Sequence, residues 1–245
     1  MSTTFAPSVA APRTVDSILD QVVRAVVIIV GLLVHSYNMF GYPLFLGDEG
    51  IYMSQAWAVL RTGQLAPYTY QYDHAPAGWL LIALWSGLTG GFHTFGTAVD
   101  GGRVLMLLLN GISMLMLFQI TLRLSRSLPA AAAATLIFAL SPLAVVYHRM
   151  VLLDNIMVFW LLLSTLLLLR HNGHLWPLMG SALCFGIAIL TKETAVFALP
   201  AYLYGLFTIV QRYHARFART GWFFIAISVT SLYVLFAALK KELCA

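Results

Sequence analysis

The sequence predicts an all-α membrane protein with about seven transmembrane helices and juxtamembrane helices in its first outer loop. Hydrophobic residues make up 60% of the 245 residues and charged residues only 9%, whereas soluble domains average roughly a quarter charged residues. Apolar segments recur along the whole chain without an internal repeat or a soluble domain. The two cysteines have neither the spacing of a disulfide framework nor that of a zinc site.

The N-terminal part divides into a head, a first span and a long loop. Residues 1–24 form a cytoplasmic head that begins rich in Ala, Pro, Ser and Thr, and residues 25–245 form the membrane module. The first span is expected over residues 25–45. The outer loop, residues 47–102, contains an amphipathic stretch and the apolar run 80–88, which is shorter than the roughly 20 residues of a comfortable span. We therefore interpret this run as a re-entrant or interfacial helix.

Six more apolar segments follow, and the distribution of charge orients them. They lie at residues 104–122, 130–147, 153–169, 175–190, 195–211 and 222–239. With the head inside, eight cations and only two acids fall on the inner side, as the positive-inside rule requires. The cations beside apolar spans thus indicate topology rather than nucleic-acid binding. An N-terminus in the cytoplasm of a bacterium and an active face outside its plasma membrane are expected.

This topology gathers most of the polar residues at the outer face, although they come from separate loops. They are Asp48, Glu49, Asp73, His74, Arg103, His148, Arg149, Asp154, Lys192 and Glu193. Charged groups near bilayer depth are costly unless they are paired or face water, so they are functional candidates by default. Carboxylates act as general bases toward a hydroxyl, and Arg or Lys holds a phosphate. The set suits transfer of a group from a lipid phosphate to an acceptor.

The order of these motifs resembles the C-type glycosyltransferases that use polyprenyl-phosphate sugars, above all the protein O-mannosyltransferases and the aminoarabinose transferases of lipid A. An acidic pair, Asp48-Glu49, opens the outer loop, and Arg103 begins the next span. A basic inner turn, Ser-Pro and an outer turn ending at Asp154 follow, and a Gly-rich helix ends in Thr191-Lys192. The resemblance covers roughly residues 25–205 and implies a seven-span module.

The resemblance also implies an inverting transfer and a role for each candidate. Asp48 is then the catalytic base that deprotonates the acceptor, and Glu49 orients the acceptor or supports Asp48. The lipid phosphate is bound by Arg103, with Lys192 and Arg149 as the assisting candidates. The remaining substrate-binding candidates are His74, Asp154 and Glu193. The implied partners are a polyprenyl-phosphate sugar donor, an acceptor protein, lipid or glycan, and membrane lipids.

Two departures from the family pattern bear on this interpretation. The loop reads His74-Ala-Pro-Ala where the family has His-x-Pro-Pro. The chain also ends at Ala245, whereas family members continue with further spans and an outer domain. The alternative function is therefore a non-catalytic membrane subunit that binds a lipid carrier or scaffolds a membrane partner. A transporter is disfavoured because it would require inverted repeats and polar groups at the bilayer midplane.

Structural explanations compete with each functional one. The acidic pair suits the positive end of a helix dipole, and Arg103 suits snorkelling at a helix end. Arg149 is expected to form a salt bridge with Asp154, and Lys192-Glu193 to pair locally. Asp154 with its neighbour Asn155 also suits a helix cap. The sugar, the acceptor, the oligomeric state and the use of a divalent ion stay open.

Overall fold

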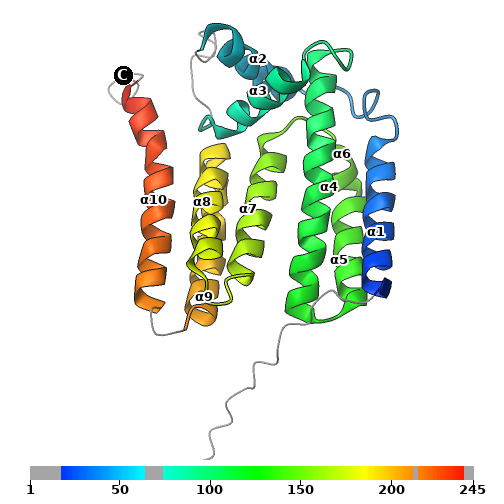
Figure 1. The fold of residues 1–245 in the computed structure, drawn as a ribbon. Coiled ribbons are helices and arrows are strands. Elements are labelled where there is room, and N and C mark those ends of the chain that lie inside the picture. The colour runs from blue at the N-terminus through cyan, green and yellow to red at the C-terminus, as the bar shows by residue number, and fades with distance from the viewer. Residues whose placement is uncertain (1–17, 64–73, 212–214, 240–245) are drawn as a thin grey trace, which may run out of the picture.

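The computed structural model describes residues 18–63, 74–211 and 215–239, and every regular element within these ranges is a helix. Helices α1 (Ile18–Ser36), α4 (Ala98–Ser125), α5 (Leu128–Leu140), α7 (Leu153–Leu169), α8 (Leu175–Thr191), α9 (Leu199–Ile209) and α10 (Ala215–Leu239) stand side by side in Figure 1. Helices α2 (Gly47–Thr62) and α3 (Ala77–Thr89) lie across one end of this bundle. The short helices are α6 (Pro142–Tyr147) and the 3₁₀ helix η1 (Glu193–Ala198).

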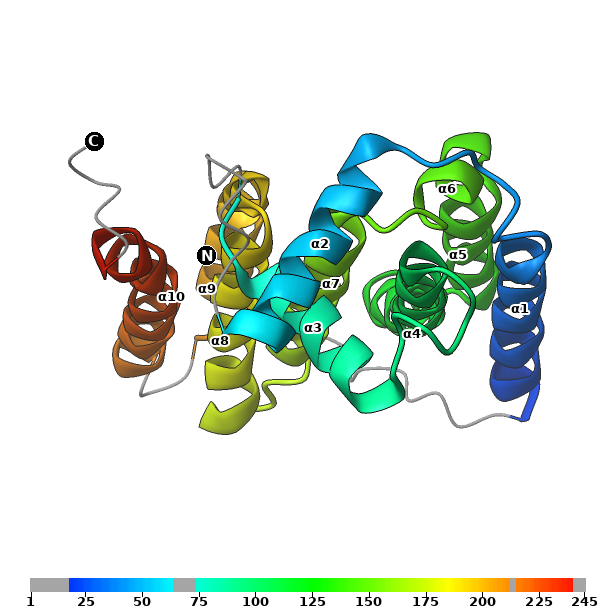
Figure 2. The same cartoon turned by 90° about the horizontal axis from the view of Figure 1, so that it is seen from above.

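The bundle forms a row in which α1 and α10 occupy the two edges (Figure 2). Helix α4 packs on α5 and α7, and α8 packs on α7 and α10. Three helices, α1, α4 and α10, have the length and hydropathy of membrane spans, whereas α3, α5, α7, α8 and the η1–α9 segment are shorter apolar helices. The helical membrane fold is confirmed, and the number of seven spans stays a prediction.

Several predicted boundaries differ from the structure for local reasons. The first helix covers Ile18–Ser36 rather than 25–45, so the predicted limit of the head at residue 24 lies inside it. The chain leaves the helix through a turn in which Asn38 has a φ of 52°, and apolar composition alone does not reveal such a turn. Residues 1–17 of the head and residues 64–73 of the outer loop lie outside the described residues.

The segment predicted as one span over 130–147 is two helices. Ser141 is extended, with φ −61° and ψ 142°, and its hydroxyl accepts a hydrogen bond from the amide of Ala144. Pro142 then occupies the first turn of α6, where its missing N–H leaves no helical hydrogen bond unmade. A Ser-Pro pair therefore ends α5 and starts α6.

A buried core under α2 and α3 connects these helices to the bundle. Its members are Tyr52, Met53, Ala56, Trp79, Ile82, Ala83, Leu105, Met106, Leu109, Met150, Val151, Leu152, Leu153 and Ile156. A close approach makes it possible, because a Cβ on Gly102 would lie 2.7 Å from the Met53 sulfur and 2.6 Å from a Val151 methyl. Glycine thus lets α2 and the 150–153 segment pack directly on the first turns of α4.

Candidate active site

Glu49 and Arg103 form an ion pair that is wholly buried. Arg103 Nε donates to Glu49 Oε1 at 3.0 Å, and Arg103 Nη2 donates to Glu49 Oε2 at 2.8 Å. Both side chains have a relative exposure of 0%. Glu49 also accepts hydrogen bonds from the amides of Val151 at 3.0 Å and Leu46 at 3.3 Å. The carboxylate is therefore saturated by four donors from three segments of the chain.

Two of the other three N–H donors of Arg103 bond to backbone carbonyls, and its guanidinium lies over an aromatic ring. Nη1 donates to Met39 O at 2.8 Å and Nη2 donates to Pro43 O at 3.0 Å. The guanidinium carbon lies 4.9 Å from the centroid of Phe45. Arg103 thus ties α4 to α2 and to the segment after α1. Both side chains are buried and bond within the protein, and the substrate roles expected for Arg103 and Glu49 stay predictions.

Asp48 lies on the other side of the same helical turn and is exposed. Successive helical residues point about 100° apart, so the buried Glu49 directs its neighbour outward. Within the described part of the chain, the Asp48 carboxylate has no hydrogen bond or ion pair. The two adjacent acids therefore have different environments: the Glu49 carboxylate is held in the core and the Asp48 carboxylate is open to solvent.

Lys192 and Asp154 join the ends of α8 and α7. Lys192 Nζ donates to both carboxylate oxygens of Asp154, at 2.8 and 2.7 Å. The side chain of Lys192 is 20% exposed and that of Asp154 is 48% exposed. Because an ammonium has three N–H donors, this pair leaves Lys192 one donor for a further partner.

His74 and Glu193 form a second link at this end of the molecule. His74 Nδ1 lies 3.0 Å from Glu193 Oε2, and the amide of Ala75 donates to Glu193 Oε1 at 2.8 Å. The carboxylate at the start of η1 thus holds the two residues that lead into α3. The expected local pairing of Lys192 with Glu193 is absent among the described residues, since each has a partner distant in sequence.

Arg149 is mostly buried and contacts the chain around the end of α1. Its Nη1 donates to Tyr42 O at 3.4 Å and its Nη2 donates to Val34 O. The expected salt bridge with Asp154 is wrong, because Asp154 binds Lys192. Burial is the main cause that lowers the pKa of Arg149 from its ordinary value. The guanidinium therefore stabilises backbone carbonyls rather than offering a free fork to a ligand.

The predicted cap at the start of α7 is also formed differently. The N-cap is Leu152, without a side-chain hydrogen bond. Asn155 instead donates its side-chain amide to Tyr147 O and Met150 O, both at 2.9 Å. The described residues contain no group of three or more His, Cys, Asp or Glu side chains placed to hold a metal ion.

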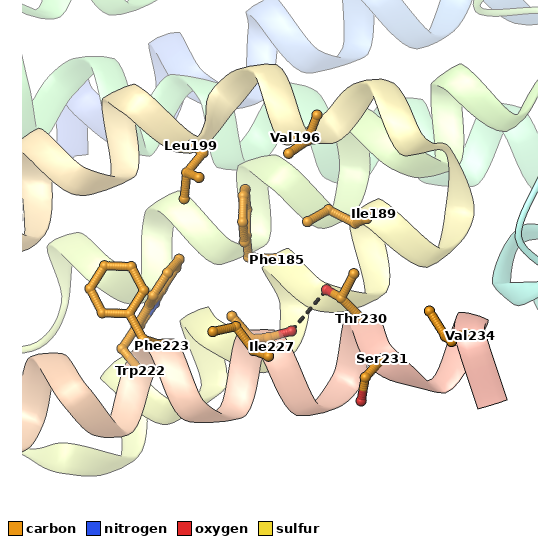
Figure 3. Close-up of a pocket in the computed structure, with 11 residues that line it drawn as sticks. Phe185, Ile189, Val196, Leu199, Trp222, Phe223, Ile227, Thr230, Ser231 and Val234 are labelled. Atoms are coloured by element: carbon orange, nitrogen blue, oxygen red, sulfur yellow. Dashed lines mark hydrogen bonds between the residues drawn. The ribbon is translucent and has the colours of Figure 1, made fainter.

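An apolar groove of about 390 Å³ lies between α10 and the neighbouring α8, η1 and α9. Figure 3 shows Phe185 and Ile189 of α8 on one side and Trp222 and Ile227 of α10 on another. The Thr230 hydroxyl donates to the Ala226 carbonyl of its own helix at 2.8 Å, which leaves the groove wall apolar. Sequence reasoning missed this groove, although aromatic and aliphatic residues four apart on two helices are the pattern that could have indicated it.

Lys192 is close in sequence to two residues of the groove wall but does not itself line the groove. Ile189 and Val196, which line the groove, precede and follow Lys192 where α8 turns into η1. The structure thus brings Lys192 and Asp154 to the same end of the bundle as Asp48, His74 and Glu193 (Figure 1). Arg103, Glu49 and Arg149 also lie at this end but are buried beneath it.

Comparison with known proteins identifies the family and the fold. The sequence profile of the dolichyl-phosphate-mannose-protein mannosyltransferase family matches residues 48–240. The fold matches a chain in the structure of the S. cerevisiae protein O-mannosyltransferase Pmt1-Pmt2 complex bound to the sugar donor, with a TM-score of 0.69 and 16% identity. That match covers 94% of this chain and 35% of the other, so this chain spans about a third of its length. No curated protein matches the sequence.

The profile match begins at Asp48 and covers most of the chain. The three long apolar helices agree with the membrane location expected for such a protein. The resemblance to glycosyltransferases that use lipid-phosphate sugars is confirmed. The chain belongs to the dolichyl-phosphate-mannose-protein mannosyltransferase family.

Proposed function

We propose that this chain transfers a sugar, with mannose the first to test, from a polyprenyl-phosphate donor to a hydroxyl acceptor. The observation that carries the proposal is the division of the acidic pair. Glu49 is buried and saturated, whereas its neighbour Asp48 is exposed and unpaired within the described residues. A carboxylate open to solvent on a rigid support has the geometry of a general base.

In the proposed reaction Asp48 accepts the proton of the acceptor hydroxyl. The acceptor oxygen forms a bond to the anomeric carbon as the bond from that carbon to the phosphate oxygen breaks. The electron pair of the broken bond leaves with the polyprenyl phosphate. A single displacement of this kind inverts the anomeric configuration. A positioned base contributes typically about 10²–10⁴-fold to such a step.

Lys192 is the proposed partner of the leaving phosphate, in place of the buried Arg103. Its ammonium is partly exposed and retains one donor beyond its two hydrogen bonds to Asp154. Charge-assisted hydrogen bonds to a phosphate oxygen stabilise the negative charge that develops on departure. Asp154 acts as a positioning residue, because it holds the ammonium from below without neutralising every donor.

The apolar groove is the proposed site of the polyprenyl chain. Its volume of about 390 Å³ lies within the range of small-molecule sites, and two residues of its wall, Ile189 and Val196, are near Lys192 in the sequence. In this proposal a lipid with its phosphate at Lys192 extends its first isoprene units toward Ile189 and Val196. The groove therefore supports a long apolar chain attached to the phosphate.

Glu49, Arg103, His74 and Glu193 have positioning roles in this proposal. The Glu49–Arg103 pair orients the first turn of α2, and the His74–Glu193 contact holds the entry to α3 beside η1. Under the topology predicted from charge, this end of the bundle faces the outside of a bacterial plasma membrane. A membrane partner subunit is also proposed, since the matched fold comes from a two-subunit complex.

Transfer of radiolabelled mannose from polyprenyl phosphate mannose, in membranes that contain this chain, tests the proposal. Asp48→Asn is expected to lower transfer at least about 10²-fold, while Arg61→Gln, an exposed change on the same helix, leaves it unchanged. Near-normal transfer by Asp48→Asn would refute the base assignment. Donor binding without transfer by the parent chain would instead favour the alternative of a non-catalytic subunit that binds the lipid carrier.

A further inference from the structure

Two arginines meet at the end of the bundle opposite α2 and α3. Arg123 lies in the last turn of α4, and Arg170 is the C-cap of α7. Arg123 Nη1 donates to Leu169 O at 3.5 Å, and Arg170 Nη2 donates to Gln119 Oε1 at 2.7 Å. The side chains are thus crossed between two neighbouring helices, and the two charges repel each other.

No carboxylate balances this pair in the described part of the chain. The described acidic residues other than Asp20 lie at the α2–α3 end of the bundle, and so do the ion pairs of Glu49, Asp154 and Glu193. Helix C-termini attract cations and account for one arginine at each helix end. They account for the hydrogen bond from Arg123 to the C-terminal carbonyl of α7, but not for the glutamine that holds Arg170 beside a second, like charge. Such an arrangement is favourable when an anion lies between the two guanidinium groups.

The surroundings indicate that the anion belongs to a lipid. Leu124, next to Arg123, is 66% exposed, and Trp176, at the start of α8 on the same end, is 87% exposed. Exposed aromatic residues at helix ends are typical of the level of the lipid head groups. A guanidinium fork matches two oxygens of a phosphate, and basic clefts between transmembrane helices bind anionic head groups.

We propose that Arg123 and Arg170 form a binding site for the phosphate of an anionic membrane phospholipid, separate from the candidate active site. Gln119 positions Arg170, and the crossed geometry of α4 and α7 sets the spacing of the two forks. The site stabilises the packing of α4 on α7 when a lipid occupies it. The proposal is independent of the proposed transfer reaction.

Native mass spectrometry of the purified chain in neutral detergent tests the site, with phosphatidylglycerol as the probe and phosphatidylcholine as the zwitterionic comparison. The double variant Arg123→Gln/Arg170→Gln is expected to bind phosphatidylglycerol roughly tenfold more weakly than the parent. Arg216→Gln removes an exposed charge from the same end of the bundle and is expected to bind as the parent does. Phosphatidylcholine is expected to bind weakly to all three proteins.

A second variant separates charge from geometry and guards against misfolding. Arg123→Lys/Arg170→Lys keeps both charges without the planar fork and is expected to bind with intermediate strength. Equal binding by the parent and the glutamine double variant would overturn the proposal, as would an equal loss in Arg216→Gln. Inorganic phosphate is expected not to displace the lipid at millimolar concentration. Complete displacement would mean that the site takes free phosphate and would overturn the lipid assignment.

Discussion

At the end of the bundle covered by α2 and α3, Arg103 and Lys192 are each held by a carboxylate. At the opposite end, Arg123 and Arg170 lie beside a backbone carbonyl and a glutamine amide instead. Charges paired within the protein fix the positions of helices, and charges without such partners are available to ligands. Two residues at the first end depart from this pairing. Asp48 is an exposed acid beside a buried, paired one, and Arg149 is mostly buried and donates to backbone carbonyls.

The largest effect is expected from breaking the buried pair. Glu49→Gln leaves the Arg103 charge without its counter-charge in the core, and such a change typically costs about 3–5 kcal/mol. Thermal unfolding of the purified protein in detergent measures this loss. Glu49→Leu/Arg103→Met removes both charges and is expected to regain part of the stability. If Glu49→Gln had the same unfolding temperature as the parent protein, the Glu49–Arg103 ion pair would not stabilise the fold.

Lys192 tests whether a charge that is paired within the protein can also bind a ligand, because it is both paired and partly exposed. Lys192→Ala is expected to weaken donor binding by about 10- to 100-fold, since a hydrogen bond to a charged group contributes roughly 1.5–3 kcal/mol. Lys192→Arg keeps the charge and serves as the control. Titration with polyprenyl phosphate gives the affinities. If Asp154→Asn lowered affinity as much as Lys192→Ala does, the pair would act as a structural unit.

Filling the apolar groove is expected to have a smaller and selective effect. Val196→Trp places a large ring in the groove, whereas Phe197→Trp changes its neighbour, which is 82% exposed and outside the groove. Binding of a long-chain polyprenyl phosphate should weaken several-fold in the first variant only, because buried apolar contact is lost. A short-chain analogue should bind both variants equally. An equal loss for both chain lengths would contradict the assignment.

The smallest effect is expected at the His74–Glu193 contact. Glu193→Gln weakens two hydrogen bonds that are partly exposed, for which a loss of about 1 kcal/mol is typical. Faster hydrogen exchange at the Ala75 amide is the expected readout, with exchange in the core of α4 as the internal control. Unchanged exchange at Ala75 would show that the contact does not hold the entry to α3.

Helix positions followed from the sequence wherever hydropathy and helix breaks coincide. Residues 153–169 were predicted as a span and are α7, and 175–190 differs from α8 by one residue. The prediction failed where a turn interrupts apolar sequence, at Asn38 and at Ser141-Pro142. Hydropathy is averaged over a window of many residues, so it does not reveal a single residue at which the backbone changes direction.

The candidate site was predictable as a group of residues at one end of the bundle but not as a set of contacts. The order of motifs pointed to Asp48, Arg103 and Lys192. Which cation pairs with which acid depends on helix rotation and on segments far apart in sequence. Asp154 and Lys192 are 38 residues apart and Glu49 and Arg103 are 54 apart. Their burial is what separates positioning residues from reactive ones, and local sequence patterns carry little information about it.

The most direct test of the division between Asp48 and Glu49 is single-turnover sugar transfer by two variants, with the folded fraction of each measured in parallel. Asp48→Asn should have the same unfolding temperature as the parent protein and should bind the donor with the same affinity. Its rate of transfer should nevertheless fall at least about 10²-fold. Glu49→Leu/Arg103→Met should keep measurable transfer in its folded fraction, because Asp48 is intact. Transfer by Asp48→Asn at the rate of the parent protein would contradict the account. So would a complete loss of transfer in Glu49→Leu/Arg103→Met but not in Asp48→Asn.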